Sequence, residues 1–318
     1  MSLKAGYADA NGASAPPDTE AAVRLISCEY NGIIHWGVVN GDQVTLCPAV
    51  PELPANMLAL IDLGRERLGE TVAAMQGHAA AVRAELAAVR LLAPIPRPRK
   101  NIICMGLNYA AHALESLQAK GLAAKAPQYP VVFTKNVTTV AGPYEDIPLD
   151  PTVTAQFDWE VELALVIGRS GRNIAKQRAL EHVFGYTVVN DLSARDIQFR
   201  HQQFFLGKSL DKACPMGPWI VSADEIPDPQ TLALSCHVNG SLKQSGNTCA
   251  QLLGVADIVS LLSRNMTLEA GDIIATGTPE GVGFARTPPE FLQAGDLVEC
   301  SIDGIGTIRN RIVAAAPG

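Results

Sequence analysis

The chain has 318 residues, of which 47% are hydrophobic and 18% charged, and its formal net charge is −7. This composition is typical of globular enzymes, and the length is sufficient for two domains. The acidic residues are scattered, which argues against binding to nucleic acid or to a membrane surface, and no apolar stretch reaches the ~18–20 residues of a membrane span.

Three features of the sequence bear on the cellular location of the protein and on the structure of its N-terminal tail. The seven cysteines are dispersed without a Cys-x-x-Cys pair, so neither a disulfide framework nor a zinc site is predicted. The N-terminus lacks a basic region followed by an apolar core, so no signal peptide is expected, and a cytoplasmic location fits. Residues 1–20 are rich in Ala, Gly, Ser, Pro and Asp, which predicts a disordered tail.

A small N-terminal α+β domain is predicted over residues 21–95. Its strands are separated by turn signals such as Asn-Gly and are expected at 23–28, 33–39 and 43–46. A helix is predicted over 68–88, where Ala, Glu, Arg and Met are frequent.

A proline-rich connector marks the domain boundary. Prolines at 94, 96 and 98 stiffen the chain, and a second, larger domain is placed after them, over residues 96–318. Beyond residue 101, short apolar runs are cut by Gly and Pro, and helices are predicted at 173–183 and 256–264. Because strands dominate and do not alternate with helices, a doubly wound sheet is excluded and an α+β, mostly β fold is predicted.

Two glutamates one residue apart stand out in the predicted strand 157–167. Glu160 and Glu162 alternate with apolar residues, so their side chains share one face, roughly 6–7 Å apart along the strand. About thirty positions later, Asp191 follows an apolar run. Neighbouring carboxylates in apolar surroundings need a cation, a shared proton or water. The trio therefore indicates a site for Mg²⁺, Mn²⁺ or Ca²⁺, while a solvated strand face is the alternative.

A histidine and a glutamate are spaced to act together. His112 and Glu115 are three apart on a predicted short helix, so they lie on one face, where the carboxylate can orient the imidazole to activate water. An exposed polar pair is the alternative. The segment 117–126 suits either a mobile lid or a plain surface loop.

Two glycine-containing segments invite a binding role. The Gly-Lys-Ser at 207–209 is not a phosphate loop, because Gln202 stands where the motif needs glycine, but Lys208 could bind a substrate anion or lie on the surface. Backbone amides of the loop 276–283 could hold a carboxylate, or the loop could be a simple turn. The loop is not a dinucleotide fingerprint, since Arg286 occupies the last glycine position.

The order of these motifs is more specific than any one of them. Gly-x-Asn-Tyr-x-x-His-x-x-Glu at 106–115, Glu-x-Glu-Leu at 160–163 and Asp-x-Ser-Ala-Arg-Asp-x-Gln at 191–198 are followed by Gly-Lys-Ser and by Thr-Gly-Thr-Pro-x-Gly-Val-Gly at 276–283. This series resembles the fumarylacetoacetate hydrolase superfamily from about residue 101 to residue 312. The resemblance implies a β-roll or sandwich, a homodimer, and a small N-terminal domain in some members.

The resemblance also assigns expected roles. Glu160, Glu162 and Asp191 would hold Mg²⁺ or Mn²⁺, with Ca²⁺ able to take the place in a crystal. His112 and Glu115 would activate water, with Lys208 stabilising the charge that develops. The substrate-contacting positions would be Gln198, Thr278, Lys135 and Arg195.

One departure narrows the expected substrate. The founding enzyme has a fourth aspartate ligand, and residues 101–115 contain no aspartate. The chain thus resembles the three-carboxylate branch, which implies hydrolysis of a C–C bond in a 2,4-dioxo acid of the acylpyruvate type. Alternatives at the same site are oxaloacetate decarboxylation and hydration or isomerisation of 2-oxo acids. A non-catalytic ligand-binding protein on the same fold is a further alternative.

Overall fold

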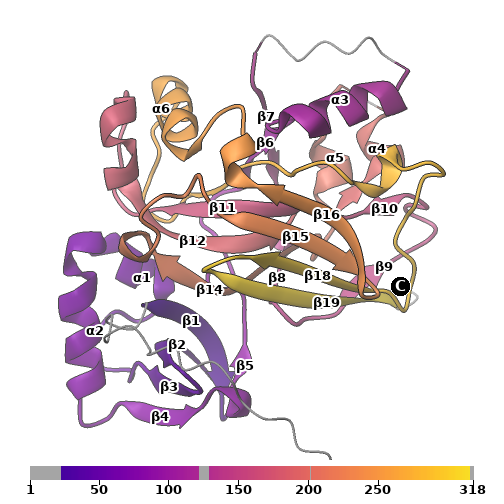
Figure 1. The fold of residues 1–318 in the computed structure, drawn as a ribbon. Coiled ribbons are helices and arrows are strands. Elements are labelled where there is room, and N and C mark those ends of the chain that lie inside the picture. Colours follow the sequence, from indigo (N-terminus) through magenta and orange to yellow (C-terminus); the bar gives the residue numbers. More distant parts are fainter. Residues whose placement is uncertain (1–22, 122–128, 201, 316–318) are drawn as a thin grey trace, which may run out of the picture.

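A computed structural model describes residues 23–121, 129–200 and 202–315 (Figure 1). Strands prevail over helices in these residues, so the expected α+β, mostly β class is confirmed. The tail predicted at 1–20 lies outside the described residues. None of the described helices combines the length and the apolar character that crossing a membrane requires.

The largest sheet combines strands from the N-terminal part and from the remainder of the chain. Its strands are β1 (Arg24–Tyr30), β2 (Ile33–Asn40), β3 (Gln43–Leu46), β4 (Val82–Glu85), β5 (Arg90–Leu91), β6 (Ile102–Gly106), β7 (Val131–Lys135), β8 (Val140–Ala141), β11 (Val161–Ile167), β12 (Val183–Asn190), β14 (Cys214–Ser222) and β17 (Ile273–Ala275). They follow the order β4-β3-β2-β1-β14-β12-β11-β17-β6-β7, with β5 paired to β1 and β8 to β14. The strands predicted at 23–28, 33–39 and 43–46 are confirmed as β1, β2 and β3.

The N-terminal strands continue the sheet of the rest of the chain. β1 pairs antiparallel with β14, with Leu25 opposite Ile220. One hydrophobic cluster contains Leu25 and Trp36 from the N-terminal part together with Cys104 and Ile220 from the remainder. The two parts therefore share backbone hydrogen bonds and buried apolar surface.

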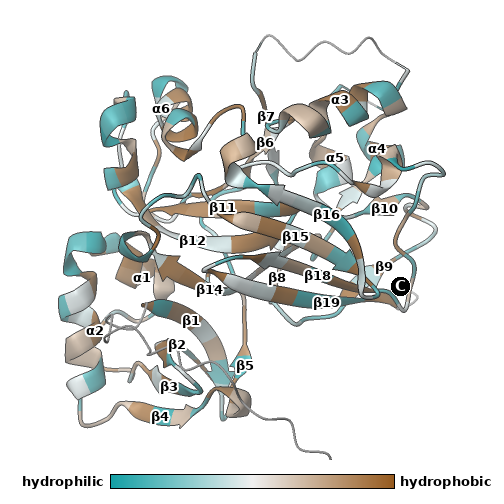
Figure 2. Ribbon diagram, viewed as in Figure 1, coloured by the Kyte–Doolittle hydropathy of each residue, from teal (hydrophilic) through white to brown (hydrophobic). Residues whose placement is uncertain are grey.

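A second sheet packs over the centre of the first. It contains β16 (Ser241–Asn247), β15 (Ala233–Val238), β18 (Leu297–Ile302), β19 (Gly306–Ala314) and β9 (Ile147–Leu149), in that order. Its inner side chains join those of β11 and β12 in the largest hydrophobic cluster. Figure 2 shows hydrophobic residues concentrated in β11 and β12. This is the expected sandwich, and its central strands are buried on both faces.

The helices lie at the margins of the two sheets. They are α1 (Met57–Asp62), α2 (Leu68–Gly77), α3 (Ala110–Ala119), α4 (Arg195–Gln198), α5 (Phe205–Lys208) and α6 (Val255–Asn265). The helix predicted at 256–264 is confirmed as α6. Figure 1 shows α3, α4 and α5 gathered on one side of the molecule.

The helix predicted over 68–88 is wrong in its second half. α2 ends at Gly77, His78 is extended, and residues Val82–Glu85 form β4. β4 pairs along the free edge of β3, so its backbone hydrogen bonds are satisfied by a neighbouring strand. Tertiary pairing therefore outweighs the helix propensity of this Ala-rich stretch.

The helix predicted over 173–183 is also wrong. Only Lys176–His182 is helical, and it is a 3₁₀ helix. The amides of Asn173 and Ile174 donate to the backbone and hydroxyl oxygens of Ser263 in α6 at 2.8 and 2.9 Å. Asn173 has a positive φ of 51° and Ala175 is extended, so the backbone at both residues is non-helical and the helical turn starts only at Lys176.

Candidate active site

Antiparallel pairing of β11 and β12 brings two of the predicted acids together. Val161 lies opposite Asn190, so Glu160 and Asp191 are neighbours just beyond the paired strands. The Asp191 amide donates to the Glu160 carbonyl at 2.8 Å. Glu162 follows within β11, and one carboxylate oxygen from each of the three residues lies within 4.8 Å of the others.

The trio is enclosed by the protein. Glu160, Glu162 and Asp191 are exposed by 5%, 1% and 0%. The alternative of a solvated strand face is therefore wrong. The strand predicted over 157–167 is also interrupted: β10 (Phe157–Asp158) pairs with β13 (Ser193–Ala194), and Glu160 lies in the break before β11.

Three buried cations contact two of these acids. The Lys208 ammonium lies 2.7 Å from both Glu160 Oε2 and Asp191 Oδ2. Lys135 Nζ lies 2.7 Å from Asp191 Oδ1, and Arg195 Nη2 lies 2.7 Å from Glu160 Oε1. Burial alone would raise the pKa of Glu160, but the charges of Lys208 and Arg195 outweigh it and hold that pKa far below its usual value.

Glu162 has a different environment. It forms no ion pair within the described residues and accepts one hydrogen bond, from the Gly277 amide at 2.8 Å. Burial, together with the charges of Asp191 and Glu160, raises the pKa of Glu162 well above its usual value. A buried carboxylate in this state is stabilised by a proton or by a cation.

The donor set fits a hard divalent cation. It offers only carboxylate oxygens, which Mg²⁺ and Mn²⁺ prefer over the nitrogen and sulfur ligands typical of zinc. A cation beside Glu162 would neutralise the one acid of the trio that the described side chains leave without a counter-charge. The site is therefore consistent with a divalent metal held by Glu160, Glu162 and Asp191.

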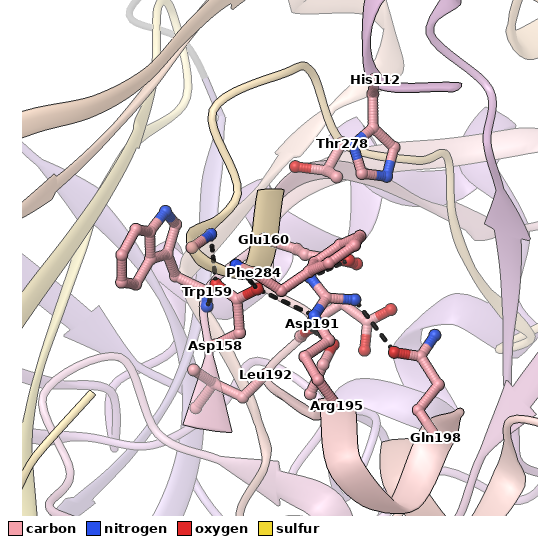
Figure 3. Close-up of polar contacts among 12 residues, drawn as sticks. His112, Asp158, Trp159, Glu160, Asp191, Leu192, Arg195, Gln198, Thr278 and Phe284 are labelled. Carbon is pink, nitrogen blue, oxygen red and sulfur yellow. Dashed lines mark hydrogen bonds and ion pairs between the residues drawn. The ribbon is translucent and has the colours of Figure 1, made fainter. Parts of the chain in front are cut away.

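His112 and Glu115 lie on one face of α3 (Ala110–Ala119), as predicted. His112 is 5% exposed, so the alternative of an exposed pair is wrong. Its Nδ1 lies 2.9 Å from Glu115 Oε1. Because a carboxylate can only accept here, Nδ1 carries the proton and Nε2 is left as the basic nitrogen. Figure 3 shows the imidazole beside Thr278, above the acidic cluster.

The loop 276–283 holds three acids through its backbone. The Gly277 amide donates to Glu162, the Gly281 amide donates to both oxygens of Glu115 at 3.1 and 3.0 Å, and the Gly283 amide donates to Asp158 at 2.7 Å. The loop amides therefore hold carboxylates, as predicted, but carboxylates of the protein itself.

Asp158 is a residue that the sequence analysis missed. It is fully buried and accepts hydrogen bonds from the Gly283 and Phe284 amides and from Arg195 Nε at 2.8 Å (Figure 3). Arg195 Nη1 in turn donates to Gln198 Oε1 at 3.0 Å. An acid between Phe157 and Trp159 was the available signal, because a charge in such apolar surroundings needs a partner.

A cavity opens above the acids. Its polar lining residues are His112, Ser116, Lys120, Glu160, Glu162, Arg195, Gln198, Lys208 and Thr278, and its apolar walls include Phe133, Phe199, Phe204 and Phe284. Lys135 is fully buried and lies behind Asp191, away from this lining. Thr278 donates its hydroxyl to the Val161 carbonyl at 2.9 Å.

Comparison with known proteins places this arrangement in a family. The model described as fumarylacetoacetate (FAA) hydrolase C-terminal matches residues 101–313. The chain belongs to the fumarylacetoacetate hydrolase family. It is thus a family enzyme, and its buried Glu-Glu-Asp cluster is consistent with a divalent metal site.

Two relatives and one solved structure extend the comparison. Oxaloacetate tautomerase YisK of Bacillus subtilis is 52% identical over 227 residues, covering 71% of this chain and 74% of the relative. The mitochondrial oxaloacetate tautomerase Fahd2a of Rattus norvegicus is 40% identical over 279 residues, covering 86% and 85%. Maleylpyruvate hydrolase from Sphingobium sp. SYK-6, solved with manganese(II) and pyruvate, is 31% identical with a TM-score of 0.74, covering 92% of this chain and all of that one.

Proposed function

We propose that this family enzyme is an oxaloacetate tautomerase, which interconverts the keto and enol forms of oxaloacetate. The similarity to two proteins of that name, over 71% and 86% of the chain, carries the proposal. This is the isomerase alternative of the sequence analysis, and it replaces acylpyruvate hydrolysis as the leading function.

The chemistry requires one proton to leave C3 and one to reach the C2 oxygen. His112 Nε2 is the group that would take the C3 proton, because the hydrogen bond of Nδ1–H to Glu115 leaves Nε2 as the free nitrogen of the neutral imidazole. Glu115 would also stabilise the imidazolium that results. No water needs to be activated, so the His–Glu pair serves this reaction as well as it serves hydrolysis.

The cavity floor would stabilise the negative charge that develops on the C2 oxygen. A divalent cation held by Glu160, Glu162 and Asp191 would supply Lewis-acid polarisation of the 2-oxo group. Burial opposes the charge of Lys208, but Asp191 and Glu160 outweigh burial and raise the pKa of Lys208 above its usual value. Lys208 would therefore stay cationic and contribute a fixed positive charge.

The test follows the decay of enol absorbance after oxaloacetate is added in its enol form, with Mg²⁺ or Mn²⁺ present. We expect the wild type to speed ketonisation and Glu160→Ala/Glu162→Ala to leave the uncatalysed rate. Consumption of the keto form by malate dehydrogenase provides an independent readout. A wild-type rate equal to that of the buffer would reject the proposal.

Hydrolysis of a C–C bond is the second candidate. The maleylpyruvate hydrolase structure shares the fold, and a His–Glu pair could also deprotonate water. Pyruvate release separates the reactions. Release from an acylpyruvate would indicate hydrolysis, release from oxaloacetate would indicate decarboxylation, and tautomerisation releases none.

The homodimer implied by the family resemblance stays a prediction, which light scattering after size-exclusion chromatography would check.

A further inference from the structure

A four-carbon dicarboxylic acid presents two anionic ends, and the cavity must accommodate both. The cationic side chains deep in the cavity, Lys208 and Arg195, already contact protein carboxylates at 2.7–2.8 Å. Lys120 also lines the cavity, and no carboxylate of the described residues forms an ion pair with it. An uncompensated cation at the edge of a cavity is suited to bind an anionic ligand.

Lys120 lies on the same face of α3 as the base. His112, Ser116 and Lys120 are spaced by four residues, which places them one above another along the helix, and all three line the cavity. Lys120 forms the C-terminal cap of α3. The spacing therefore aligns a base, a hydroxyl and an ammonium along one wall.

Ser116 gives an independent sign of a polar ligand. Its side chain is 3% exposed, and its hydroxyl has no hydrogen-bond partner among the described residues. Leaving a buried hydroxyl without a partner is destabilising, so such groups normally have one. A carboxylate in the cavity would accept a hydrogen bond from Ser116 and pair with Lys120.

Aromatic rings support the Lys120 ammonium and separate it from a second cation. Lys120 Nζ lies 4.0 Å from the centroid of the Phe199 ring, Phe199 packs edge-on against Phe284 at 5.2 Å, and the Arg195 guanidinium lies 4.5 Å from the Phe284 centroid. Burial and the charge of Arg195 lower the pKa of Lys120, and the charge of Glu160 offsets them only in part. The negative charge of a bound anion would offset both effects, so this wall of the cavity favours anionic ligands.

We propose that Ser116 and Lys120 bind the distal carboxylate of the substrate and select dicarboxylic 2-oxo acids over monocarboxylic ones. The assignment rests on the proposed function, which supplies a substrate with a second carboxylate. In oxaloacetate the carbon next to that carboxylate is C3. Holding the C4 carboxylate one helical turn from His112 would therefore direct C3 toward the base.

Binding of non-reactive analogues to the Mn²⁺-loaded protein tests the assignment. Malate and 2-hydroxybutyrate share a four-carbon chain and a 2-hydroxy acid group, and only malate has the distal carboxylate. We expect Lys120→Gln to weaken malate binding about tenfold in isothermal titration calorimetry, which corresponds to about 1.4 kcal/mol. The affinity for 2-hydroxybutyrate should change much less, and Ser116→Ala should act in the same direction with a smaller effect.

Matched variants guard against a general disturbance of α3. Gln118→Ala alters an exposed residue of the same helix and should preserve the wild-type ratio of the two affinities. Lys120→Arg should restore most of the preference for malate. Equal losses of both ligands in Lys120→Gln, or no preference for malate in the wild type, would overturn the assignment.

Kinetics separates this inference from the proposed function. The ratio of kcat/KM for oxaloacetate to that for its 4-methyl ester should fall about tenfold in Lys120→Gln. If the wild type fails to tautomerise either compound but binds malate in a Lys120-dependent way, the dicarboxylate site stands and the tautomerase proposal falls. If wild type and variant turn over both compounds with equal efficiency, the tautomerase proposal stands and the dicarboxylate site falls.

Discussion

Among the three acids of the site, Glu162 has no ion-pair partner in the described residues. Its substitution should therefore remove metal binding without destabilising the fold. We expect Glu162→Gln, measured without metal, to have a Tm equal to or above that of the wild type, because repulsion from Glu160 and Asp191 is removed. Saturating Mn²⁺ should raise the wild-type Tm by about 5 °C and leave the variant unchanged.

Differential scanning fluorimetry with and without chelator measures both values. A fall in the Tm of the metal-free variant would mean that the Glu162 carboxylate stabilises the fold through contacts other than the Gly277 amide. An equal response of both proteins to Mn²⁺ would remove Glu162 from the ligand set.

His112 is expected to affect turnover and to leave the metal in place. His112→Ala should lower kcat for tautomerisation by about 10²–10⁴-fold, the usual contribution of a general base. Mn²⁺ affinity should stay near the wild-type value, since His112 lies on α3 and the three acids lie on or beside β11 and β12. Glu115→Gln should give a smaller loss, because the amide can still hold Nδ1–H. Parallel losses of kcat and Mn²⁺ affinity would contradict this division of roles.

At the level of single residues, the sequence identified the groups but not their partners. The spacing of Glu160 and Glu162 was informative because a strand places such residues on one face. Contacts between residues far apart in the chain could not be predicted from the sequence. Lys208 contacts Asp191 only after α5 packs beside the site, and Asp158 accepts a hydrogen bond from the Gly283 amide, 125 positions away. Ser116 and Lys120 carry no motif, and only the helix geometry reveals them as neighbours of the base.

At the scale of elements, a glycine sets how α4 and α5 pack. A Cβ added to Gly207 would lie 2.4 Å from the Gln198 amide nitrogen and 2.6 Å from its Cα. These are backbone atoms, so the two helices would have to separate, which would displace Gln198 and Lys208. Gly207→Ala should lower stability by about 1–3 kcal/mol and reduce kcat/KM more than tenfold.

Gly69 in α2 is the matched control. A Cβ there meets nothing within 4 Å, and Gly69→Ala should raise stability by about 0.5–1 kcal/mol while leaving kcat/KM unchanged. Urea denaturation and steady-state kinetics on both variants provide the comparison. Full activity in Gly207→Ala would show that the α4–α5 contact does not position the site.

Elements were predictable where the local pattern and the tertiary structure agree. α6 has an apolar face, an acidic residue in its first turn and a basic residue in its last, and it forms as expected. The stretch 82–88 lacks a comparable pattern, and pairing of β4 with β3 decides its structure. Sequence propensity alone contains no information about a free strand edge elsewhere in the fold.

At the scale of the whole molecule, the N-terminal segment and the remainder should unfold together. β1 hydrogen bonds to β14, and Trp36 and Met57 share a hydrophobic cluster with Ile102 and Ile220. We propose that residues 21–95 are a distinct segment of the fold that depends on residues 96–318 for stability. Calorimetry of the full chain should therefore show one transition that includes both parts.

A chain restricted to residues 96–318 tests the same point. Its β14 edge and part of the shared core would be exposed, so we expect aggregation or a lower Tm. Two separate transitions in the full chain, or a truncated protein as stable as the full one, would show instead that the two segments fold independently. The family resemblance anticipated the sandwich, but it did not specify how the N-terminal strands join it.

The loop 276–283 holds Glu115, Glu162 and Asp158 through main-chain amides. Main-chain donors are present whatever side chain a residue carries, so the geometry of these acids depends on the path of the loop and not on the side chains that it exposes. Substitution at the exposed Glu280 should therefore be well tolerated, whereas positions that fix the path, such as Gly281, should not. Acids held by main-chain amides keep their positions when side chains around them are substituted. The walls of the cavity can then diverge toward new substrates while the acids and the base keep their places.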